Sequence, residues 1–115
     1  MRGKIGDPQR LQHITHAIGE IEMYTDGVTF EHFSANSMMR FATVKQLEII
    51  GEACNLLTPE IKAKATQVEW RKIIGLRNML VHEYFGISTQ LVWQIVVGDL
   101  PEFKKQIIEL TDQLI

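Results

Sequence analysis

Apolar side chains recur every three or four residues along most of this chain, and that periodicity is the strongest constraint on its fold. Alternation of apolar and polar residues, typical of a half-buried strand, is scarce. A first helix is predicted to begin at Asp7 and Pro8, with Asp7 as its N-cap. Its apolar stripe comprises Leu11, Ile14, Ala17, Ile18 and Ile21. The pattern predicts an all-α fold.

Three more long helical segments follow, over about residues 37–57, 69–84 and 91–114. The second has an apolar stripe formed by Phe41, Val44, Leu47, Ile50, Cys54 and Leu57. Gly51 lies in the middle of that helix, which indicates close approach of another helix. The last segment is predicted to be interrupted over 98–101, where Asp99 would cap a new helix. Short helices are predicted after Thr29 and Thr58, and Ser88 is predicted to cap the last helical segment.

The predicted architecture is an up-and-down bundle of four main helices with one or two short extra helices, in a single domain over residues 1–115. Twelve basic and fourteen acidic residues leave a net charge of −2. No apolar run approaches the roughly 18 residues that would span a bilayer. The lone cysteine, Cys54, fits a reducing compartment. We therefore expect a cytoplasmic protein.

Positive charge is concentrated in the segment 62–82, where five basic residues face Glu69 alone and give a local charge of +4. On a helical projection of the third helix, Arg77 lies in the middle of the apolar arc. A guanidinium there is costly to desolvate unless it is paired or lines a wet cleft. It either forms an internal ion pair, with Glu48 or Glu52 as candidate partners, or binds an anion at a cleft or subunit boundary.

Asn78 and His82 lie one helical turn apart on the polar shoulder beside Arg77. At this spacing an amide can orient an imidazole, and histidine is the side chain best suited to move protons near neutral pH. On one ideal helix Arg77 and His82 are separated by roughly 140°. They could act on one phosphate if the helix unwinds after His82, or if symmetry-related helices meet at a dimer interface.

The segment Trp70 to Phe85, WRKIIGLRNMLVHEYF, resembles the signature of HepT-like proteins, a branch of the HEPN superfamily. Their motif is Arg, four residues, His, one residue and Tyr, commonly with Asn after the Arg. The resemblance extends to RLQHI near the N-terminus, to LEIIGEA in the second long helix and to VW…DLP near the end. It therefore covers essentially the whole chain, and its fold would be a HEPN-like helical bundle.

The resemblance implies a toxin of a toxin–antitoxin module that works as a homodimer and cleaves RNA, tRNA or mRNA, without a metal. Arg77 and His82 would be the catalytic pair, and Asn78 would position one of them or the substrate. The implied partner is MntA, a nucleotidyltransferase antitoxin that silences the toxin by transferring AMP to Tyr84. No cofactor is expected for this chain, since the antitoxin uses the ATP, and no membrane partner is expected.

Two other functions remain open from the sequence. The same residues could hold a phosphate in a non-catalytic module that presents nucleotide or substrate to a nucleotidyltransferase. Alternatively, the chain is a purely structural helical dimer with a buried Arg77 ion pair to Glu48 or Glu52. No metal site is expected, because His13 and His16 have no matching third ligand.

Overall fold

The computed structural model describes residues 6–82 and 86–114, and it is helical almost throughout these ranges. The elements in chain order are α1 (Asp7–Thr25), α2 (Phe30–Ala35), α3 (Ser37–Leu56), α4 (Pro59–Ala63), α5 (Trp70–His82), α6 (Thr89–Gln94), a π-helical turn η2 (Ile95–Asp99) and α7 (Leu100–Asp112). No strand occurs in these ranges. The prediction of an all-α bundle with four long helices is confirmed.

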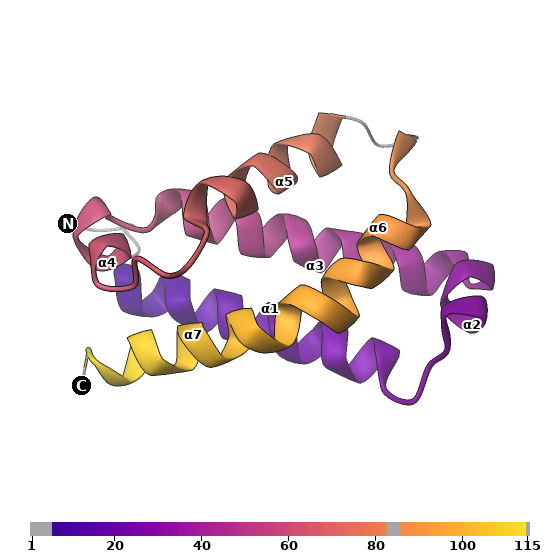
Figure 1. The fold of residues 1–115 in the computed structure, drawn as a ribbon, viewed down its shortest axis with the longest axis horizontal. Helices are drawn as coiled ribbons and strands as arrows, with labels where there is room; N and C mark the ends of the chain where they lie inside the picture. The colour runs from indigo at the N-terminus through magenta and orange to yellow at the C-terminus, as the bar shows by residue number, and fades with distance from the viewer. Residues whose placement is uncertain (1–5, 83–85, 115) are drawn as a thin grey trace.

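Helix α3 is the centre of the bundle, because α1 and α5 both pack along it (Figure 1). Helix α7 runs beside α1. Helix α6 contacts α2 at one end of the molecule, and η2 continues the chain from α6 into α7. Helices α2 and α4 lie at opposite ends of the molecule, which measures 43 × 28 × 27 Å. Among the residues that the structure describes, α5 packs extensively on α3 alone, so a large part of α5 borders cavities or solvent.

Hydrogen-bonding side chains cap the short helices where the sequence predicts them. Thr29 accepts a hydrogen bond from the backbone N–H of His32 at 3.1 Å, and Thr58 accepts one from Ile61 at 3.3 Å. Ser88 likewise accepts from Leu91 at the start of α6. Each hydroxyl satisfies a backbone donor that the first turn of a helix leaves without a partner.

The prediction that Asp7 is the N-cap of the first helix is wrong, because Gly6 occupies that position and Asp7 is already helical. The Asp7 carboxylate instead accepts hydrogen bonds from the backbone N–H and the hydroxyl of Thr58, at 3.0 and 2.6 Å. It therefore joins the beginnings of α1 and α4, which are 51 residues apart in the chain.

The predicted interruption over 98–101 is also wrong in form. Asp99 does occupy the N-cap position of α7, as predicted, but it makes no side-chain capping hydrogen bond, and η2 carries the helix from α6 into α7 without a break. Pro101 explains the wider turn, since it lacks an N–H and its ring would collide with the carbonyl four residues earlier. A π-turn accommodates such a residue without ending the helix.

The core is formed by the predicted stripe of α1, all of whose members are buried, together with apolar residues of α3, α6 and α7. Phe33 of α2 is fully buried and stacks at a tilt on Trp93, with ring centroids 5.0 Å apart. The assignment of Phe41 to the core stripe is wrong, since it is 50% exposed. None of the helices in the described ranges combines the length and apolar character required to cross a membrane.

Candidate active site at the crossing of α3 and α5

Gly51 allows α5 to approach α3 closely at the position of Arg77. A Cβ atom built on Gly51 would lie 2.2 Å from Cβ of Arg77 and 3.3 Å from its Cα. These distances are far shorter than van der Waals contact, so only glycine fits here without moving α5. The mid-helix glycine that the sequence singles out therefore determines where the Arg77 side chain leaves the crossing.

The Arg77 guanidinium is held by two side chains. Its Nη2 atom lies 2.9 Å from Oε1 of Glu52 on α3, and Nη1 donates a hydrogen bond to Oδ1 of Asn78 at 2.9 Å. A guanidinium has further N–H donors on its other edges. Two acceptors thus orient the group and leave it able to bind an anion. The predicted pairing with an acid of α3 is found with Glu52.

Arg77 and Glu52 border a polar cavity of about 270 Å³ between α1 and α5, floored by α3. Glu48, the other acid proposed as a partner, lines this cavity as well. The remaining lining residues are Arg10 and His13 from α1, Lys45, Ile49 and Ala53 from α3, and Val81 from α5. The cavity joins acids and bases from three helices beside the predicted catalytic arginine.

Arg10, His13 and Lys45 were not predicted as site residues. Arg10 and His13 are three residues apart, which places them on one face of α1, and Lys45 lies three residues before Glu48 on α3. These spacings show which face of its own helix each residue occupies. They do not show that the two faces meet beside Arg77, because that depends on how α1 and α5 pack against α3.

Two other predicted site residues lie toward the C-terminal side of Asn78. His82 is one turn after Asn78 and is the last residue of α5 that the structure describes, so the predicted extension of this helix to Tyr84 lies outside the described residues. Tyr84, the predicted site of modification, lies outside the described residues. The roles of Arg77, His82, Asn78, Glu48, Glu52 and Tyr84 therefore stay predictions.

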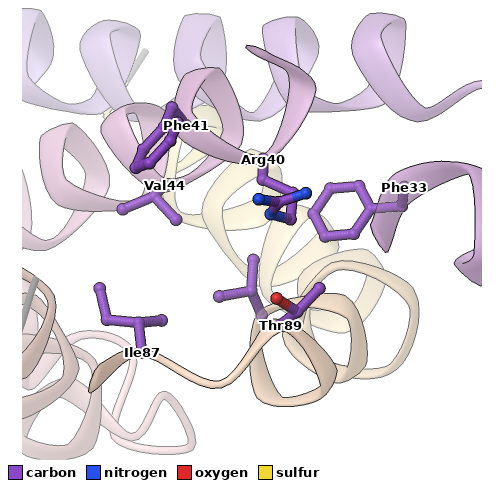
Figure 2. A pocket seen from close by; sticks show the side chains of 7 residues that line it. Phe33, Arg40, Phe41, Val44, Ile87 and Thr89 are labelled. Carbon is purple, nitrogen blue, oxygen red and sulfur yellow. The ribbon is translucent and has the colours of Figure 1, made fainter. Parts of the chain in front are cut away.

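A second cavity, of about 180 Å³, lies where α3 faces the segment that leads into α6 (Figure 2). Arg40 borders it beside the ring of Phe33, and Ile87 and Thr89 close the opposite side. Nη1 of Arg40 donates a hydrogen bond to the carbonyl of Ser34. Since lysine and arginine side chains stabilise the last carbonyls of helices, Arg40 has a structural role at the end of α2.

Burial makes Cys54 a poor nucleophile. The side chain is fully buried in α3, and loss of solvation there raises the pKa of its thiol to about 12, with a smaller opposing effect of Lys62. The thiolate is the reactive form of cysteine, so the thiol stays protonated and inert at neutral pH. This agrees with the expectation that Cys54 belongs to the apolar stripe of α3.

Comparison with protein families shows a match over most of the chain. The family described as "Ribonuclease HepT-like" matches residues 14–110, which include the crossing of α3 and α5 and the motif from Arg77 to Tyr84. No solved structure matches the chain.

Curated relatives cover similar lengths. The protein named "Putative RNase MJ1380" from Methanocaldococcus jannaschii is 37% identical over 97 residues, which are 84% of this chain and 89% of that protein. "Putative RNase TTE0752" from Caldanaerobacter subterraneus is 36% identical over 85% of this chain and 90% of its own length. "Probable ribonuclease HepT" from Thermococcus cleftensis is 35% identical over 82% and 86%, respectively.

Proposed function

Because the chain belongs to the HepT-like ribonuclease family, we propose that it is a metal-independent endoribonuclease and the toxin of a toxin–antitoxin module. The observation that carries this proposal is the placement of Arg77. The guanidinium is fixed by Glu52 and Asn78 at the edge of a cavity large enough for part of a nucleotide. Its geometry suits a group that binds a phosphate rather than one that only links two helices.

In the proposed reaction the ribose 2′-oxygen attacks the neighbouring phosphorus, and the bond from phosphorus to the 5′-oxygen breaks. His82 takes or supplies the proton that this step requires. Arg77 stabilises the negative charge that develops on the phosphate oxygens in the transition state. Asn78 keeps the Arg77 fork in the plane that matches two phosphate oxygens. The products are a 2′,3′-cyclic phosphate and a 5′-hydroxyl.

RNA cleavage in EDTA tests this function. We expect purified protein, confirmed by mass to be free of AMP, to cut tRNA or mRNA and leave cyclic-phosphate ends. His82→Ala should cleave RNA at least about 100-fold more slowly than the wild type, since it removes the proton-transferring group. His16→Ala is the matched control, because His16 is an exposed histidine of α1 that does not line the cavity, and it should cut normally.

Absence of cleavage by the unmodified protein would contradict the proposal. It would favour the non-catalytic module, in which Arg77, Asn78 and His82 hold a phosphate for a nucleotidyltransferase partner. Equal cleavage by wild-type protein and His82→Ala would show that another group carries out the proton transfer.

We further propose that the working unit is a homodimer whose subunits meet along α5. The support is the incomplete burial of α5, which within the described ranges packs extensively on α3 alone. Leu76 and Met79 border a mainly apolar cavity of about 530 Å³ between α5, α3 and α6, and Val81, at the edge of the cavity that contains Arg77, is 40% exposed. An isologous interface would cover these side chains and bring the two Arg77–His82 pairs toward a two-fold axis.

We propose that a nucleotidyltransferase antitoxin of the MntA type silences the enzyme by transferring AMP from ATP to Tyr84. The tyrosine oxygen would attack the α-phosphorus and release pyrophosphate. An adenylyl phosphate two residues after His82 would place negative charge and bulk near Arg77. Substrate would then be excluded both sterically and by neutralisation of the guanidinium.

The two tyrosines of the chain allow a matched test of this modification. Incubated with antitoxin and ATP, wild-type protein should gain the mass of at least one AMP, and Tyr84→Phe should gain none because it lacks the accepting oxygen. Tyr24→Phe should be modified normally, since Tyr24 lies near the C-terminal end of α1, where its hydroxyl bonds to Glu20 and Gln46 and does not line the cavity beside Arg77. Modification of the Tyr84→Phe protein would place the AMP elsewhere.

A further inference from the structure

Two basic residues besides Arg77 line the polar cavity between α1 and α5. Arg10 is half-buried on α1, and Lys45 is exposed on α3. They come from parts of the chain that are 35 residues apart and belong to neither the arginine–histidine motif nor the local basic segment that contains it. The fold therefore adds positive charge to the site from two other helices.

Arg10 carries a hydrogen-bond donor that the described residues leave unsatisfied. Its Nε atom is buried, and no acceptor among these residues bonds to it. A buried donor without an acceptor costs free energy, and the cost is larger for a charged group. An oxygen of a bound anion would remove this cost. Phosphate suits the site, because a guanidinium binds two of its oxygens at once.

The balance of charge within the cavity also favours a polyanion. Glu52 is already paired with Arg77, which leaves Arg10 and Lys45 to face Glu48. The cavity follows α3 from Lys45 to Ala53, which corresponds to about 12 Å along the helix axis. Such a length exceeds a single phosphate group. The excess of positive charge is local, since the whole chain carries −2.

We propose that this cavity is the RNA-backbone groove of the enzyme, in which Arg10 and Lys45 bind a phosphate next to the one that is cleaved. Arg77 would act on the scissile phosphate at one edge of the groove, while Arg10 and Lys45 hold the neighbouring nucleotide. This inference rests on the proposed ribonuclease function, because it assumes that the substrate is RNA. It adds two binding residues outside the motif.

Binding of a labelled single-stranded RNA oligonucleotide by fluorescence anisotropy tests the groove. The His82→Ala protein serves as background throughout, so that the RNA stays intact. Removing one phosphate contact lowers the slope of log Kd against log salt concentration by about 0.7 for a single strand. We expect this decrease, and roughly three- to tenfold weaker binding at low salt, for Lys45→Met and for Arg10→Met.

Lys105→Met is the matched control, because Lys105 is an exposed lysine of α7 outside the cavity, and its slope and Kd should be unchanged. Lys45 is exposed, so its variant should fold even if Arg10→Met does not. The proposal is overturned if Lys45→Met binds like Lys105→Met. A separate assay of RNA cleavage in EDTA, with protein that retains His82, distinguishes failure of this proposal from failure of the ribonuclease function. If the protein cuts RNA but Lys45→Met leaves the salt dependence of Kd unchanged, only the groove is refuted. If Lys45→Met lowers the salt dependence but the protein does not cut RNA, only the ribonuclease function is refuted.

Discussion

Arg77→Ala is expected to lose at least about 100-fold of RNA cleavage while remaining folded. Removing one group that stabilises the developing charge of a transition state costs this much in other enzymes. The effect on stability should be small, because the Arg77 and Glu52 side chains are 30% and 44% exposed and water screens their ion pair. Pairs of this kind stabilise a protein by about 1 kcal/mol or less. Alanine also keeps the Cβ that contacts Gly51.

The same variant also tests whether the ion pair between Arg77 and Glu52 has a purely structural role. A buried ion pair that loses one partner destabilises a protein by about 3–5 kcal/mol, which thermal or urea unfolding would detect readily. A loss of that size in Arg77→Ala would support the structural role. Arg77→Lys adds a second comparison, since lysine keeps the charge but lacks the planar fork that binds two phosphate oxygens. It should recover little of the activity.

Mixing two inactive proteins tests whether the site is shared between subunits. If Arg77 of one subunit acts with His82 of the other, a dimer of Arg77→Ala and His82→Ala chains contains one intact pair. When equal amounts of the two chains assort at random, half of the dimers are mixed. Each mixed dimer has one intact site out of two, so about a quarter of the wild-type activity should return. No recovery after confirmed subunit exchange would place each complete pair within one chain.

Gly51→Ala is expected to lower the free energy of unfolding by about 2 kcal/mol and to reduce cleavage at least tenfold. The new Cβ would lie 2.2 Å from Cβ of Arg77, and the nearby Cα belongs to the backbone, so α5 must move away from α3. Overpacking of this kind costs about 1–3 kcal/mol. A shift of about 1 Å in a catalytic group is enough to lower a rate strongly. Thermal unfolding should begin about 10 °C lower.

Gly19→Ala provides the control for Gly51→Ala. Gly19 also lies inside a long helix, but nothing is within 4 Å of a Cβ built on it. It should therefore show only the higher helix propensity of alanine and become more stable by up to about 1 kcal/mol. If Gly51→Ala behaved like Gly19→Ala in both stability and cleavage, the close crossing of α3 and α5 would not be needed to place Arg77.

Much of the helical organisation follows from local chemistry. Thr29, Thr58 and Ser88 cap helices where the sequence predicts them, and the stripe of α1 is buried throughout. Capping joins residues three apart, and an apolar stripe repeats every three or four residues. Both are therefore readable from a short stretch of sequence. The positions of Arg77 and Asn78 on one helix were accessible in the same way, whereas the sequence left the acidic partner of Arg77 open between Glu48 and Glu52, and the structure shows Glu52.

Other features depend on neighbours that the sequence does not reveal. Asp7 is a good capping residue, yet it bonds to Thr58 because α4 begins beside it. Phe41 continues the apolar stripe of α3, but it borders the cavity that Ile87 and Thr89 close and is half exposed. Pro101 marks a discontinuity, and only the path of the chain shows that a π-turn absorbs it. In each case local preference is compatible with several arrangements.

The sequence by itself determined the helices, the bundle and the motif that places Arg77, Asn78 and His82 along α5. The tertiary structure alone decided that α1 and α5 lie on either side of one face of α3, which brings Arg10 and Lys45 to the cavity at Arg77. The reason is physical: helix formation and capping depend on interactions within about four residues. The meeting of distant helices depends on how their side chains pack, and here on the missing side chain of Gly51.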